Sequence, residues 1–198
     1  MISSTFLNIM VVGVVVVIGL MYQEKNTNDL IYVESTKDGR KYMVRNLPDK
    51  EKAANMMSKI RENLVTVKEY LNKNRSSDER TGLINAKFRP DNMRETEKGS
   101  KHTSYSVNKG EKLVFCMRSK NEDENLVDMN TMMFVALHEM AHIMTKSIGH
   151  TPEFWKNFKY LLKIAVKLGL YKEVDYSTTP QKYCGMTVSD TPLTDPTI

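Results

Sequence analysis

Three of the four histidines in this 198-residue sequence lie close together, at His138, His142 and His150. The first two are four residues apart, and Glu139 directly follows the first, so the segment matches the pattern HExxH. In an α-helix, residues i and i+4 lie one turn apart on the same face, so both imidazoles can reach one ion at the ~2.0–2.1 Å typical of zinc. The spacing therefore predicts a zinc site on a helix.

Glu139 is the residue in this pattern that could transfer a proton. It lies ~100° around the helix from His138, which places it beside the metal but outside the expected ligand set. From there it can accept a proton from a zinc-bound water while the zinc lowers the pKa of that water and polarises a substrate carbonyl. We therefore expect a zinc metalloendopeptidase that hydrolyses peptide bonds, with Glu139 as general base.

A catalytic zinc usually takes three protein ligands and leaves the fourth position to water. His150 is the favoured third ligand, because it follows Gly149 just before a second helix and a tight reversal could bring it back over the first. Glu153 is an alternative ligand, and another group is a third option. An acidic side chain at Glu153 would also interact favourably with the positive end of the second helix.

The elements that position these residues follow from hydrophobic periodicity and turn signals. The pattern predicts a helix over 126–146 carrying HExxH and a second helix that starts at Thr151 and Pro152. Earlier in the chain, a hairpin turns at Asp38 and Gly39, and a second hairpin turns at 108–110. The remaining predicted elements are a helix over 49–73, a short strand at 83–88, strands at 103–107 and 112–117, and an extended tail over 171–198 that covers part of the domain.

The segment "HEMAH…GHTPEFWKNFKYLL" resembles the active-site segment of the SprT and WLM group of minimal zincin peptidases. It is especially similar to predicted metallopeptidases of large DNA viruses. The resemblance implies zinc at His138, His142 and His150, Glu139 as the base, and an α+β domain with a small antiparallel sheet and an active-site helix. It also implies a strand beside the cleft, within 103–116, that pairs with an extended protein or peptide substrate.

Cellular members of this group act on proteins crosslinked to DNA. A DNA-protein crosslink protease is therefore an alternative function, and nucleic acid is a partner that we do not favour. A catalytically silent zinc-binding scaffold of a membrane or virion is the other alternative. The net charge of +5 does not by itself mark a nucleic-acid binder.

An apolar run without charge, residues 6–22, precedes the polar part of the chain. A helix of this length just spans a ~30 Å hydrocarbon core, so we expect a transmembrane anchor over 1–23, with a cleaved signal peptide as the alternative. A linker over 24–30, a metallopeptidase domain over 31–176 and an extended tail over 177–198 would follow. Lys and Arg occur only after the apolar run, which favours a single-pass protein of a host or virion membrane with a cytosolic domain.

Cys116 and Cys184 are too few for a disulfide scaffold, so we expect reduced thiols, with a single bridge between them as the alternative. Three further side chains, of His102, Tyr105 and Tyr183, could approach an oxyanion, although each is first interpreted as a surface or packing residue. The sequence leaves the oligomeric state open.

Overall fold

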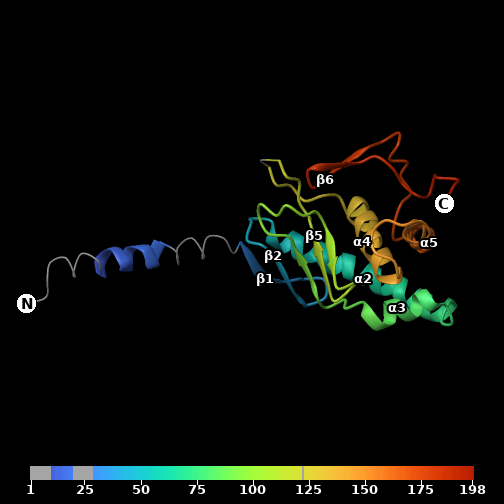
Figure 1. Ribbon diagram of the computed structural model, residues 1–198, viewed down its shortest axis with the longest axis horizontal. Helices are drawn as coiled ribbons and strands as arrows, with labels where there is room; N and C mark the ends of the chain where they lie inside the picture. Colours follow the sequence, from blue (N-terminus) through green and yellow to red (C-terminus); the bar gives the residue numbers. More distant parts are fainter. Residues whose placement is uncertain (1–9, 20–28, 122) are drawn as a thin grey trace, which may run out of the picture.

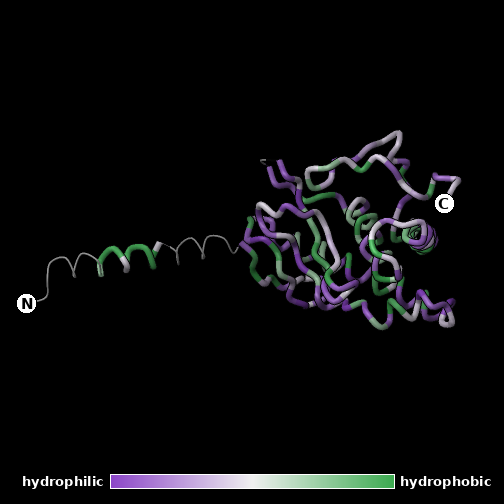
Figure 2. Tube along the Cα trace, in the orientation of Figure 1, coloured by the Kyte–Doolittle hydropathy of each residue, from purple (hydrophilic) through white to green (hydrophobic). Residues whose placement is uncertain are grey.

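The computed structural model describes residues 10–19, 29–121 and 123–198 (Figure 1). Residues 10–19 form a helix, coloured hydrophobic in Figure 2. Among these described residues, the structure contains no helix that is both long enough and apolar enough to cross a membrane. The anchor predicted over 1–23 lies partly outside the described residues, since its ends are not among them.

A five-stranded sheet forms one side of the domain, with the strand order β1-β2-β3-β5-β4. The two hairpins predicted from the sequence are confirmed, with Leu30 opposite Arg45 in the first and Tyr105 opposite Val114 in the second. The strands are β1 (Leu30–Glu34), β2 (Lys41–Arg45), β3 (Met93–Glu95), β4 (Tyr105–Val107) and β5 (Lys112–Phe115).

The prediction of an antiparallel sheet is wrong in its centre, because β3 pairs in parallel with both β2 and β5. Parallel neighbours need a long crossover. The chain between β2 and β3 provides one through two helices, α2 (Lys50–Asn74) and α3 (Glu79–Lys87). The sheet is therefore mixed, and β4 is left as an edge strand.

The strand predicted at 83–88 is also wrong, since most of this segment belongs to α3. Asp78 begins that helix as its N-cap, and its side chain accepts the backbone N–H of Arg80 at 2.9 Å. The apolar run is too short to distinguish a helix from a strand by its period. Ile84 is buried against the core, and the remaining turns of α3 are largely polar.

The helices of the core bear out the predicted periodicity. Residues Ala53, Met57, Ile60, Leu64, Val67 and Leu71 form the buried stripe of α2. The helix α4 (Met129–Met144) contacts α2, α3, α5 and β4, and this explains why twelve of its sixteen residues are buried. Figure 2 shows hydrophobic residues inside the domain and hydrophilic ones on the outer loops. The helix α5 (Pro152–Lys167) packs against α4 with one apolar face.

A buried arginine links the start of α2 to the sheet. Arg118 donates from Nε to Glu95 at 2.8 Å and from Nη1 to Asp49 at 2.9 Å. Arg118 is 4% exposed and Glu95 is 1% exposed, so each buried charge has a partner of opposite sign. Such pairing matters because an unpaired buried charge is strongly destabilising.

The C-terminal segment contains a small hairpin, β6 (Gln181–Tyr183) and β7 (Met186–Val188), that lies above α4 in the view of Figure 1. The expectation of reduced thiols is wrong, because Cys116 and Cys184 form a disulfide. The fold explains the pairing: the turn between β6 and β7 returns Cys184 to the residue that follows β5, with a Cα–Cα distance of 6.0 Å. Both cysteines are buried.

Candidate metal centre and substrate cleft

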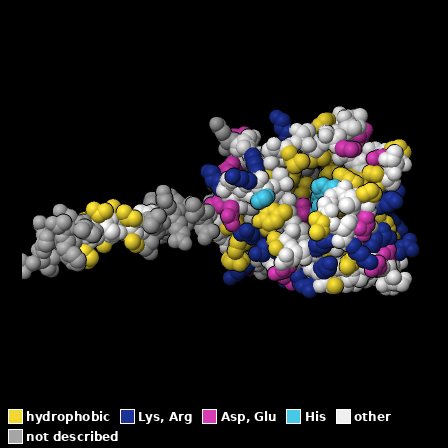
Figure 3. Space-filling view, viewed as in Figure 1, with side chains coloured by type: hydrophobic (Ala, Val, Ile, Leu, Met, Phe, Trp, Pro, Cys, Tyr) yellow, Lys and Arg dark blue, Asp and Glu magenta, His cyan; other side chains and the backbone are white. Residues whose placement is uncertain are grey.

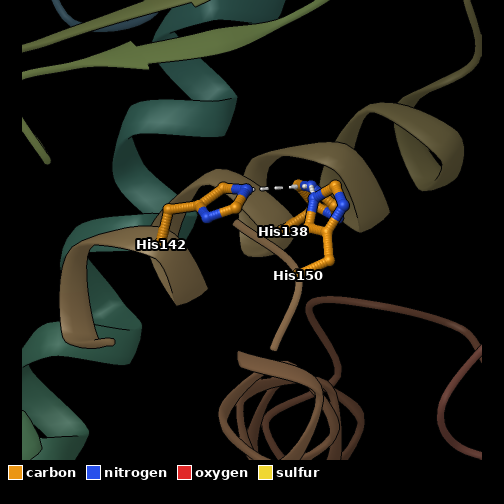
Figure 4. Close-up of side chains that lie close together, drawn as sticks. All are labelled: His138, His142 and His150. Carbon is orange, nitrogen blue, oxygen red and sulfur yellow. Dashed lines mark hydrogen bonds between the residues drawn. The ribbon is translucent and has the colours of Figure 1, made fainter. Parts of the chain in front are cut away.

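The three histidines singled out by the sequence converge (Figure 4). His138 and His142 project from one face of α4, and His150 enters from the loop that precedes α5. The Nε2 atom of His138 lies 3.2 Å from that of His142 and 3.0 Å from that of His150. The candidate ligand atoms all lie within 4.8 Å of one another. They can therefore face one common point.

The loop that carries His150 is fixed by a lysine from the second hairpin. Lys109 donates from Nζ to the backbone carbonyls of Thr145, Lys146 and Ser147, at 2.8, 2.6 and 3.0 Å. These carbonyls follow the end of α4, where a cation is favourable because helix C-termini carry partial negative charge. The loop between the two helices is thus held from the β4–β5 turn.

Glu153, the alternative third ligand, serves this loop instead. Its carboxylate accepts the backbone N–H of Lys146 at 3.1 Å and that of Ser147 at 3.2 Å. The Ser147 hydroxyl donates to it at 2.7 Å, and these hydrogen bonds lower the pKa of Glu153. Thr151 caps α5 as predicted, by accepting the N–H of Phe154. The reversal between the helices therefore has its own polar framework.

Burial keeps two of the imidazoles neutral. Desolvation, with smaller contributions from the charges of His142 and His150, lowers the pKa of His138 to about 3. Burial, followed by the charges of His150 and Lys109, lowers the pKa of His142 to about 4. A neutral imidazole is the form that binds metal, so both side chains are in the ligating state at neutral pH.

Glu139 lies on α4 next to the histidines and is 5% exposed. Burial raises the pKa of this carboxyl to about 8, and a backbone hydrogen bond from Ser106 opposes that increase. Ser106 is the central residue of the edge strand β4. The carboxyl is therefore placed between the histidine cluster and the strand predicted to lie beside the cleft. A nearby cation would favour its ionised form.

A cleft with a volume of about 630 Å³ opens over these residues. Figure 3 shows this hollow, with histidine atoms at its side and hydrophobic atoms along its rim. Its polar wall includes His138, Glu139 and residues of β4. The rest of the lining is largely apolar and comes partly from residues 186–190 of the C-terminal segment and from aromatic side chains of α4 and α5 next to the histidines. The tail predicted to cover the domain thus borders the cleft.

The remaining candidates from the sequence separate into two groups. Tyr105 and Tyr183 line the cleft, and the Tyr183 hydroxyl shares a hydrogen bond of 2.5 Å with the Ser104 hydroxyl. His102 packs against the ring of Tyr105, with centroids 5.6 Å apart, and does not belong to the cleft lining.

Sequence reasoning missed the role of Lys109 in holding the loop before α5, because no local pattern connects this lysine to a carbonyl 36 residues away.

Comparison with known families matches the WLM domain over residues 36–192. An uncharacterized protein of Acanthamoeba polyphaga mimivirus is 31% identical over 193 residues, which cover 94% of this chain and 98% of that protein. An uncharacterized protein of Invertebrate iridescent virus 6 is 36% identical over 94 residues, covering 47% of this chain and 52% of the relative.

Two crystal structures of Wss1 from Saccharomyces cerevisiae are also similar. The mutant form has a TM-score of 0.48 and 22% identity, covering 65% of this chain and 92% of that chain. The other has a TM-score of 0.44 and 20% identity, covering 64% and 90%. The family match, which spans most of the sequence, and the relatives in large DNA viruses bear out the resemblance: the chain belongs to the WLM family.

Proposed function

We propose that this chain is a zinc-dependent peptidase in which His138, His142 and His150 hold the metal and Glu139 is the general base. The observation that carries this proposal is the convergence of three Nε2 atoms beside a buried carboxyl at the side of an open cleft. The family relationship supports the same class of reaction.

The three side chains suit zinc. A tetrahedral ion with bonds of ~2.0–2.1 Å separates its ligand atoms by ~3.3 Å. The two Nε2 separations from His138, 3.2 and 3.0 Å, are close to that value, and all three candidate ligand atoms lie within 4.8 Å of one another. Both contacts lie at hydrogen-bonding distance, and a cation at their common point would instead accept the lone pairs of all three nitrogens. When bound, zinc would supply a Lewis acid that polarises a carbonyl and lowers the pKa of water.

Each protein group then has a defined task. Glu139 accepts a proton from the attacking water and returns it to the leaving amine. The strand β4 ends the described sheet, so its outer edge can pair with an extended peptide and orient the bond to be cut, apart from the Ser106 N–H, which bonds to Glu139. Lys109 holds the loop that positions His150.

The test uses the full chain in detergent with zinc supplied, comparing the wild type with Glu139→Gln and His142→Ala. A matched control is Glu69→Gln, which changes an exposed glutamate of α2. We expect about one zinc per chain in the wild type, Glu139→Gln and the control, with cleavage of an unfolded protein only by the wild type and the control. His142→Ala should lose both zinc and activity.

Two results would change the assignment. Zinc binding without cleavage of any of several unfolded substrates would favour the scaffold function. A wild-type protein that takes up no zinc would refute the metal centre itself.

The membrane location is a separate proposal. It is supported by the apolar run over 6–22 and by the side chains of the helix at 10–19, of which Met10 to Val12 and Val14 to Ile18 are each more than half exposed. An exposed apolar surface of this extent suits a lipid environment. We expect the full chain to float with lipid vesicles and a chain starting at residue 24 to remain with the soluble fraction. Equal flotation of the two forms would refute the anchor.

A further inference from the structure

Two well-exposed hydrophobic side chains lie on the rim of the cleft. Ile148, in the loop between α4 and α5, is 89% exposed, and Met186, the first residue of β7, is 50% exposed. Single exposed hydrophobic residues are common on protein surfaces. These two belong to segments far apart in the sequence and border the same hollow, which suggests a shared binding role.

The interior between them is also apolar. The residues behind the rim are Phe134, Val135, Trp155, Phe158 and Val188. Phe134 and Phe158 pack on each other with ring centroids 5.0 Å apart, so this wall is already ordered. Pockets of this kind, with an apolar wall beside a few polar groups, bind ligands that have a hydrophobic part.

The apolar wall lies where a side chain of a bound peptide substrate would reach it. It adjoins His138 and Glu139 on one side, and the edge strand β4 lies along the same cleft. A peptide paired with β4 would direct alternate side chains to one side of the strand. A peptide residue whose backbone lies beside Glu139 would therefore place its side chain against the apolar wall.

We infer that this wall, with Ile148 and Met186 at its rim, receives a large apolar side chain next to the bond that is cut. The inference rests on the proposed peptidase function and adds a substrate preference to it. Peptides with an aromatic or branched aliphatic residue at that position would be cleaved in preference to those with a small or charged residue.

The test measures kcat/KM for the full chain in detergent with zinc, using peptides that differ only in the residues flanking the cleaved bond. Hydrophobic pockets discriminate by ~10-fold to 200-fold for even one methylene. We expect a preference of ~100-fold or more for Leu or Phe over Asp. The rim variant Met186→Asp should reduce that preference by ~10-fold, and Met186→Leu should retain it.

The matched controls are Val166→Asp and Tyr32→Asp, which change exposed apolar residues, 37% and 68% exposed, that do not line this cleft. Both should keep the wild-type preference. Ile148→Asp, with its zinc content checked because His150 is close in sequence, should behave like Met186→Asp. The zinc-loaded Glu139→Gln protein should bind the peptides in the same order of affinity.

The outcomes separate the two ideas. Cleavage without preference, or rim variants that match the controls, would overturn the inference and leave the peptidase assignment intact. Loss of zinc binding and of cleavage in the wild type would overturn both.

Discussion

Removing the disulfide should destabilise the domain by an amount that follows from its place in the chain. Cys116 and Cys184 are separated by 68 residues, so the bond closes a long loop in the unfolded chain. The chain-entropy relation gives ~4 kcal/mol at 25 °C for a loop of this length, and measured values are typically ~2–4 kcal/mol. For a protein of this size, 1 kcal/mol corresponds to ~2–4 °C, so the double variant Cys116→Ala/Cys184→Ala should unfold ~10 °C lower.

The assay is urea and thermal unfolding of the oxidised wild type, the reduced wild type and the double alanine variant. Reductant should lower the stability of the wild type and leave that of the variant unchanged, which separates the bond from other effects of reductant. Mass analysis after alkylation under denaturing conditions should find no free thiol in the oxidised wild type. Two alkylated thiols in that sample, or equal unfolding midpoints for all three proteins, would refute the reasoning.

Three further predictions concern the frame of the site. Gly110 and Gly39 both have a positive φ, but a Cβ at Gly110 would lie 2.9 Å from a side-chain atom of Ile143 on α4, whereas a Cβ at Gly39 would meet open space. Gly110→Ala should therefore lower the urea midpoint well beyond Gly39→Ala. Lys109→Met should weaken zinc affinity ~10-fold in a chelator competition, while Lys163→Met on the exposed face of α5 should not. A neighbouring guanidinium lowers the pKa of Asp49. The stabilisation from Asp49 is therefore present above its unfolded pKa of ~3.9 and is lost as the pH falls through the lowered folded value. Asp49→Asn should accordingly lose less melting temperature than the wild type on acidification below pH ~4.

Local patterns in the sequence predicted the parts of the fold that local contacts determine. The Asp38–Gly39 turn specified the first hairpin, and the periodicity of apolar residues specified α2, α4 and α5. The approach of His138, His142 and His150 followed from their spacing and from the reversal at Gly149. These features depend on neighbours within a few residues, which is why residue types and spacing were sufficient.

The predictions that failed depend on contacts between distant segments. Parallel pairing of β3 depends on how the crossover through α2 and α3 packs, and the disulfide depends on where the C-terminal hairpin folds back. The segment at 83–88 lacked a decisive period, and tertiary packing of Ile84 placed it in a helix. None of these contacts has a signature within the short window that periodicity uses.

One element, the β4–β5 hairpin, connects both walls of the cleft. Its turn provides Lys109, which holds the loop bearing Ile148 and His150, and Gly110, which packs closely on α4. Ser104, just before β4, accepts the backbone N–H of Cys116 at 3.0 Å and contacts the Tyr183 hydroxyl.

The residue after β5, Cys116, is bonded to the turn that leads into Met186 and the rest of β7. The histidine cluster and both rim residues are thus positioned from the same strand pair, although Met186 lies after α5 and the histidines and Ile148 lie before it. A change in this hairpin should therefore affect metal binding and substrate preference together, whereas a change on the outer face of α5 should affect neither.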